Sequence, residues 1–110
     1  MSAAAVLPEI EVIGEEVEKE DLDRLYHVIL LDDDDHTYEY VIEMLMELFN
    51  FSEQKAYEHT VEVDTKGHTR LITCALSEAE KKRDQIHAHG ADWRLERSVG
   101  AMAALIEPAE

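Results

Sequence analysis

The segment from residue 25 to residue 49 constrains the fold more than any other part of the sequence. It begins with an apolar, partly β-branched run over residues 25–31, which is typical of a buried strand. Four consecutive aspartates, Asp32 to Asp35, end this run. Apolar side chains then recur at helical spacing, at Tyr38, Val41, Ile42, Leu45 and Phe49. The segment predicts a strand that turns through an acidic corner into a buried helix.

The next part of the chain predicts a second helix followed by a second strand. Ser52 is suited to cap the helix, and Gly67 is suited to end it in a left-handed turn. Residues 68–76 then alternate between apolar and polar side chains, which favours a strand. One face of this strand should carry Ile72, Cys74 and Leu76, so we expect the single cysteine to be a core residue.

A third helix and a third strand complete the predicted order. Ser77 and Glu80 have the spacing of a capping box, so the helix should start there and stop at residues 89–90. A polar loop should precede a last strand over residues 99–106, with Pro108 just beyond its end. The order β-α-α-β-α-β predicts an α+β fold, with a three-stranded antiparallel sheet and three helices on one face.

Length and patterning predict one domain with a tail. The chain has 110 residues, which suits a single core. Residues 1–23 include eight acidic residues and only scattered Val, Ile and Leu, so we expect a flexible acidic N-terminal tail before a core domain over residues 24–110. No apolar run approaches the ~20 residues that span a bilayer. The N-terminus also lacks the basic flank of a secretory signal.

Charge and cysteine content narrow the classes of partner. The formal net charge is −16, which disfavours binding to nucleic acid or to anionic membrane. It favours cationic partners, such as ammonium groups, guanidinium groups, metal ions and basic protein surfaces. A single cysteine, Cys74, allows no disulfide within the chain, so a reducing cytoplasm is the expected compartment.

The acidic corner has two interpretations from its residues alone. It can be a capped strand–helix turn, with an aspartate, His36 or Thr37 capping the helix. It can also be a cation site, because adjacent carboxylates repel one another unless a cation matches them. A metal is disfavoured: the run lacks the alternation and the glycine of an EF-hand, and the histidines lack ligand spacing.

Catalytic motifs are not evident in the sequence. We find no serine or cysteine nucleophile beside a plausible base and no glycine-rich phosphate loop. A phosphoacceptor receiver domain would need more repeated strand–helix units than the three visible strands supply. We therefore expect no enzyme and no cofactor.

Residues 26–41 resemble the signature of the ClpS family, adaptors of the ATP-dependent Clp protease. There the stretch is similar to Tyr-Lys-Val-Ile-Leu-Val-Asn-Asp-Asp-Tyr-Thr-Pro-Met-Glu-Phe-Val. The resemblance covers roughly residues 25–107, more loosely toward the C-terminus. It implies the same β-α-α-β-α-β order, a fold like that of the C-terminal domain of the ribosomal stalk protein.

The resemblance also implies a function and a site. Such adaptors bind the N-terminal residue of proteins destined for degradation and deliver them to a Clp-family AAA+ ATPase, ClpA- or ClpC-like. The positions implied to hold the N-terminal ammonium are Asp32, Asp33, Asp34 and Asp64. The positions implied to form the pocket and contact the peptide backbone are His36, Thr37, Tyr38, Val41, Thr60, Val63 and Met102. The resemblance further implies that residues 1–23 correspond to an N-terminal extension that engages the ATPase. We expect a monomer when free.

Two positions depart from the family pattern at the implied ammonium site. Asp32 stands where the family has Asn, and Asp64 stands where it has His. Three or four carboxylates can satisfy an ammonium, but they can equally raise one another's pKa or favour another cation. An alternative therefore stays open: an acidic cation- or protein-binding module that shares the fold without N-degron specificity.

Overall fold

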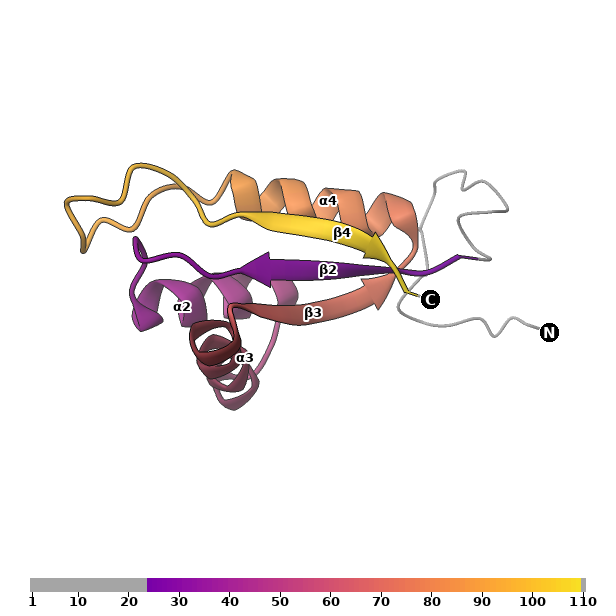
Figure 1. Cartoon of the computed structure of the whole chain (residues 1–110), viewed down its shortest axis with the longest axis horizontal. Helices are drawn as coiled ribbons and strands as arrows, with labels where there is room; N and C mark the ends of the chain where they lie inside the picture. The colour runs from indigo at the N-terminus through magenta and orange to yellow at the C-terminus, as the bar shows by residue number, and fades with distance from the viewer. Residues whose placement is uncertain (1–23, 110) are drawn as a thin grey trace.

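The computed structural model describes residues 24–109, and the predicted tail lies outside this range. Three antiparallel strands form one sheet: β2 (Tyr26–Leu31) lies in the centre, between β3 (His68–Cys74) and β4 (Ala104–Pro108) (Figure 1). β2 pairs with a neighbour along both of its edges. Its apolar composition agrees with this central position. This arrangement confirms the expected antiparallel sheet.

Three helices, α2 (Tyr38–Phe49), α3 (Glu53–Lys66) and α4 (Leu76–His87), accompany the sheet (Figure 1). Their ends follow local chemistry. The hydroxyl of Ser52 accepts from the Lys55 N–H at the start of α3. Gly67 ends α3 at φ 89°, a left-handed conformation that glycine adopts without strain. The predicted α+β fold is confirmed, with three helices on one face of a three-stranded sheet.

The start of the last helix differs from the sequence prediction. α4 begins at Leu76, and its N-cap is Ala75, which makes no side-chain capping bond. Ser77 therefore lies inside the first turn, where its buried hydroxyl has no hydrogen-bond partner among the described residues. The capping box was wrong because Ala75 and Ala79 are both fully buried. The packing of these two alanines in the core sets where α4 begins, although Ser77 alone would favour a later start.

A bulge alters the expected alternation of β3. Val28 pairs with Ile72, but the next residue, Ile29, pairs with Arg70. Leu71 is thus the extra residue, and its side chain is buried while Ile72 is only partly so. The predicted face of Ile72, Cys74 and Leu76 is wrong in this respect, and β3 ends at Cys74. The core position of Cys74 is confirmed by its 1% exposure.

The C-terminal elements are shifted relative to the prediction. α4 ends at His87 rather than at residues 89–90, and β4 starts five positions later than expected, at Ala104. Val99, the expected first residue of the strand, is 91% exposed. Pro108 is the last residue of β4. A proline is tolerated there because β4 is an edge strand, where the backbone N–H that proline lacks would point away from the sheet.

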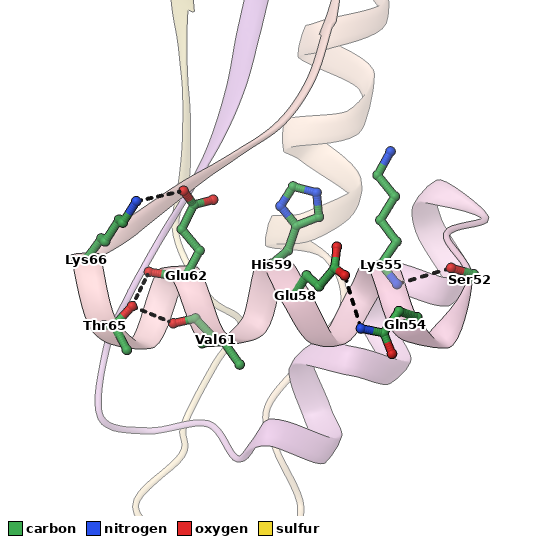
Figure 2. Close-up of a pocket in the computed structure, with 9 residues that line it drawn as sticks. All are labelled: Ser52, Gln54, Lys55, Glu58, His59, Val61, Glu62, Thr65 and Lys66. Carbon is green, nitrogen blue, oxygen red and sulfur yellow. Dashed lines mark hydrogen bonds and ion pairs between the residues drawn. The ribbon is translucent and has the colours of Figure 1, made fainter.

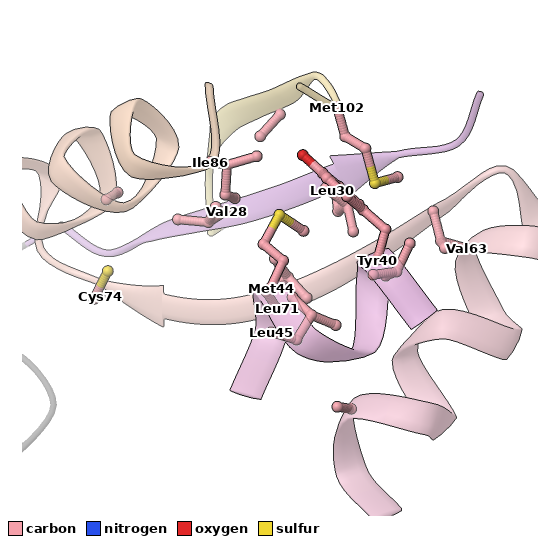
Figure 3. Packing of buried hydrophobic residues seen from close by; sticks show 14 of the residues in the cluster. Val28, Leu30, Tyr40, Met44, Leu45, Val63, Leu71, Cys74, Ile86 and Met102 are labelled. Carbon is pink, nitrogen blue, oxygen red and sulfur yellow. The ribbon is translucent and has the colours of Figure 1, made fainter. Parts of the chain in front are cut away.

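The core lies between the sheet and the helices. Val28 and Leu30 of β2 are fully buried and meet Met44 and Leu45 of α2 (Figure 3). The cluster also includes Ile86 of α4, so all the layers share one core. In the part of the chain that the structure describes, the helices are too short or too polar to cross a membrane.

Candidate functional site

The acidic corner is held in place by its backbone. The Asp32 N–H donates to the carbonyl of Gly67 at 3.0 Å, and the Leu31 N–H donates to the carbonyl of Ala103 at 3.0 Å. These bonds place the end of β2 between the α3–β3 turn and the segment that leads into β4. Residues from three distant parts of the sequence therefore meet at the corner.

Thr37 caps the helix that follows the corner. Its hydroxyl oxygen accepts from the Tyr40 N–H at 3.2 Å, so Thr37 rather than an aspartate is the N-cap of α2. The capped-turn interpretation is confirmed for Thr37. The predicted peptide-contacting position is thus also the residue that starts the helix.

Asp92 is a site residue that the sequence did not indicate. Its fully buried carboxylate accepts from the Thr37 N–H at 2.6 Å and from the Thr37 hydroxyl at 2.8 Å. The N–H and the guanidinium of Arg94 donate to the other oxygen at 3.0 and 3.2 Å. Burial by itself raises the pKa of Asp92, but these donors outweigh it and hold the pKa at about 2.

His36 provides a second bond between the corner and the C-terminal loop. Its side chain is only 3% exposed, and Nδ1 lies 2.7 Å from Asp33 Oδ1. Nε2 lies 2.8 Å from the carbonyl oxygen of Gly100, and the ring packs 4.5 Å from that of Tyr40. His36 therefore fastens the corner to residue 100 instead of facing solvent.

Asp32, Asp64 and Tyr38 come together at the exposed side of the corner. The Tyr38 hydroxyl donates to Asp64 Oδ2 at 2.7 Å. The pKa of Asp32 is raised, first by partial burial and then by the negative charges of Asp64, Asp33 and Asp34, while a backbone hydrogen bond from Asp33 opposes the rise. The structure thus brings Asp64, 32 positions later in the chain, into the field of Asp32.

The other aspartates of the corner have structural partners. Asp33 Oδ1 accepts from the Asp35 N–H at 2.9 Å as well as facing His36. The backbone carbonyl of Asp34 accepts from the guanidinium of Arg97, which also pairs with Asp35 at 3.3 Å. Among these three aspartates, Asp33 and Asp35 therefore have side-chain partners within the protein.

Four of the predicted pocket positions are buried in the interior. Their exposed fractions are 4% or less, for Val41, Thr60, Val63 and Met102. The Thr60 hydroxyl donates back to the carbonyl of Ala56 at 2.8 Å. Figure 3 shows Met102 and Val63 approaching the group around Leu30 and Tyr40 from different segments. A ligand side chain that enters here must displace core residues.

A separate cavity of about 660 Å³ lies along another side of α3 (Figure 2). His59 borders it, with Nδ1 2.8 Å from the hydroxyl oxygen of Thr69, which itself donates to Glu62. Burial and the nearby Lys55 lower the pKa of His59. His59 and Asp64 are five residues apart, which is roughly 140° around a helix of 3.6 residues per turn. This cavity is therefore not part of the acidic corner.

Clustered metal ligands are not found in the described range. Within residues 24–109, no three side chains of the types His, Cys, Asp and Glu are grouped so that they could hold a metal ion. The contacts that the structure shows at the corner are hydrogen bonds and ion pairs.

Comparison with known proteins gives matches to one family. The model of a family described as ATP-dependent Clp protease adaptor protein ClpS matches residues 21–94. The ClpS adapter protein of Nautilia profundicola is 34% identical over 64 residues, which cover 58% of this chain and 66% of that protein. That of Methylococcus capsulatus is 37% identical over 65 residues, which cover 59% and 61%. That of Synechococcus elongatus is 32% identical over 72 residues, which cover 64% and 76%. The matches thus span from 61% to 76% of the length of these relatives.

A solved structure gives the same result at the level of the fold. Agrobacterium tumefaciens ClpS2 bound to L-phenylalaninamide superposes with a TM-score of 0.67 at 25% identity. The likeness covers 77% of this chain and 96% of the other. Together with the match over residues 21–94, this confirms the resemblance seen at residues 26–41. The chain belongs to the ClpS family, the adaptor proteins of the ATP-dependent Clp protease.

Proposed function

We propose that this protein is a non-enzymatic adaptor that binds the N-terminal residue of substrate proteins and delivers them to a Clp ATPase–protease. Membership of an adaptor family supports the general role. The structural neighbour ClpS2 is bound to L-phenylalaninamide, which carries a free α-amino group next to an aromatic side chain. A peptide that begins with a bulky residue presents the same two groups.

The convergence of Asp32 and Asp64 carries the proposal for the ammonium. Burial and then the negative charge of Asp64 contribute to the raised pKa of Asp32, so a positive charge bound beside the two carboxylates would relieve their repulsion. An ammonium offers a positive charge and donors for charge-assisted hydrogen bonds, which are shorter and stronger than neutral ones. Asp33 and Asp34 would add to the negative field, since both raise the pKa of Asp32.

The apolar residues beneath the corner would receive the first side chain. Val41, Val63 and Met102 come from three separate segments and belong to one buried core cluster. Burying a large apolar side chain contributes about 1.5–3 kcal/mol, which offsets part of the cost of moving these residues apart. We infer that the pocket forms as the ligand enters.

The proposed partners follow from the same role. One is a Clp-family AAA+ ATPase, ClpA- or ClpC-like, and the others are substrate proteins with destabilising N-terminal residues. We propose a cytoplasmic monomer that forms a complex with the ATPase.

Calorimetric titration with short peptides tests the ammonium clamp. Peptides that begin with Phe, Leu, Trp or Tyr should bind at least about tenfold more tightly than the same peptides N-acetylated, because acetylation removes the charge. Exposed Asp84 of α4 supplies a matched control, and Asp84→Asn should leave the preference unchanged. Equal affinity of free and acetylated peptides would exclude the clamp.

The clustering of negative charge around Asp32 also favours one other candidate, an acidic module that binds cationic side chains. Such a module would bind N-acetylated peptides with internal Arg or Lys as well as it binds free N-termini. The titration above therefore separates the two functions when one basic acetylated peptide is added to the series.

A further inference from the structure

The hydroxyl of Tyr38 forms a hydrogen bond with the carboxylate of Asp64, which is one of the groups proposed to bind the ligand's ammonium. Its oxygen donates to Asp64 Oδ2 at 2.7 Å, across the gap between the first turn of α2 and the last turns of α3. Tyr38 is 39% exposed, so the contact lies at the surface, where a ligand can reach it. Asp64 thus has a hydrogen-bond donor before a ligand arrives.

Tyr38 is held in this position from both ends. Its backbone follows directly on Thr37, which two hydrogen bonds fasten to buried Asp92. Its ring meets the ring of Tyr57 edge-on at 6.4 Å. Both the backbone and the ring of Tyr38 thus have neighbours that support its contact with Asp64.

The hydroxyl is a weaker partner for Asp64 than a cation would be. Two cationic side chains have other partners: Lys66, two residues after Asp64, pairs with Glu62, and Arg97 pairs with Asp35. A phenol offers one neutral donor, whereas an ammonium offers three donors and a full charge. An arriving ammonium can therefore replace the hydroxyl on Asp64, while an uncharged amide gains little by doing so.

We propose that Tyr38 is a latch on the ammonium site: its hydroxyl bonds to Asp64 Oδ2 in the free protein, and the N-terminal ammonium competes with it for this oxygen. This inference rests on the proposed function and adds a residue that sets the threshold for binding. It makes the site selective, because a ligand without a positive charge cannot open the latch. Removing the hydroxyl should leave Asp64 available and strengthen binding.

The test is calorimetric titration of Tyr38→Phe with a Phe-initiated peptide and its N-acetylated form. Loss of a competing hydrogen bond of ordinary net strength should tighten binding of the free peptide about 2- to 10-fold. The acetylated peptide should bind as it does to the parent protein. Phenylalanine keeps the ring and its contact with Tyr57, and thermal unfolding verifies that the variant folds.

Tyr57→Phe is the matched control. Tyr57 is 47% exposed, and among residues 24–109 its hydroxyl forms no hydrogen bond within the protein. Its removal should leave the affinity unchanged. A second comparison adds Tyr38→Phe to the Asp64→Asn variant. There, Tyr38→Phe should no longer tighten binding of the free peptide, because the carboxylate that accepts from the Tyr38 hydroxyl is absent.

The outcomes separate the latch from the proposed function. Tighter binding by Tyr38→Phe that disappears in Asp64→Asn supports the latch. A free-amine preference in the parent protein with equal or weaker binding by Tyr38→Phe overturns the latch and leaves the clamp intact. Equal binding of free and acetylated peptides by both proteins overturns the clamp, and the latch with it.

Discussion

The carboxylate of Asp92 accepts hydrogen bonds from two groups of Thr37, 55 positions earlier in the chain. This contact joins the loop after α4 to the first turn of α2, directly beside Tyr38. A buried carboxylate survives here because four donors surround it, from Thr37 and Arg94. One residue thus stabilises the corner without facing any ligand.

Asp92→Asn should destabilise the protein in a way that depends on pH. The folded-state pKa of Asp92 is depressed from 3.8 to about 2. Its ionised form therefore contributes stability above pH ~4, and this contribution is lost as the pH falls through about 2. We expect a loss of about 2–3 kcal/mol at neutral pH that shrinks toward zero near pH 2.

Urea unfolding of the parent protein and of Asp92→Asn, at a series of pH values from 7 to 2, measures this difference. Asp84→Asn, an exposed carboxylate on α4, serves as the control and should show a small, flat difference. A difference for Asp92→Asn that stays constant across the acid range would contradict the assignment.

The elements of this fold follow local sequence patterns where packing agrees with them. α2 and α3 have the starts and ends that apolar spacing, Ser52 and Gly67 predict. α4 and β4 do not, because Ala75, Ala79 and Met102 are placed by the core, and the core is assembled from distant segments. The bulge at Leu71 is likewise a property of the pairing with β2 and has no local signal.

Ser77→Ala distinguishes the two starting points of α4. A serine N-cap contributes about 1 kcal/mol, so its loss would lower stability by that amount if Ser77 capped the helix. The structure places Ala75 at the N-cap and leaves the buried Ser77 hydroxyl without a partner among the described residues. We expect Ser77→Ala to be neutral or stabilising in urea unfolding, since it removes an unsatisfied polar group.

Ser52→Ala provides the comparison within the same chain. Ser52 does cap α3, where its hydroxyl accepts from the Lys55 N–H at 3.1 Å. This substitution should cost about 1 kcal/mol. Equal losses for the two variants would mean that Ser77 is a cap after all.

At the scale of the whole molecule, the order of the elements and the acidic corner were predictable from the sequence. The four aspartates and the helix after them are contiguous, so their relation needs no knowledge of the rest of the chain. Asp64 was predicted only through the family resemblance, and the structure places it beside Tyr38. Asp92 was missed because a lone aspartate in a polar loop carries no signal of the partner that it will meet.

The different contacts of the corner carboxylates can be seen only in the structure. In the sequence, nothing distinguishes Asp32, Asp33 and Asp34 from one another. In the structure, Asp33 contacts His36, whereas Asp32 lies close enough to Asp64 to be affected by its charge. The proposed clamp therefore depends on two carboxylates that lie on different elements. Their joint action on one ammonium is the central claim.

A double cycle of substitution and acetylation tests this claim most directly. Calorimetry gives the affinity of a Phe-initiated peptide, free and N-acetylated, for the parent protein and for Asp32→Asn and Asp64→Asn. If both carboxylates contact the ammonium, each substitution should shrink the effect of acetylation by about 1 kcal/mol or more, a coupling typical of groups in contact. An effect of acetylation that is the same in all three proteins would contradict the account.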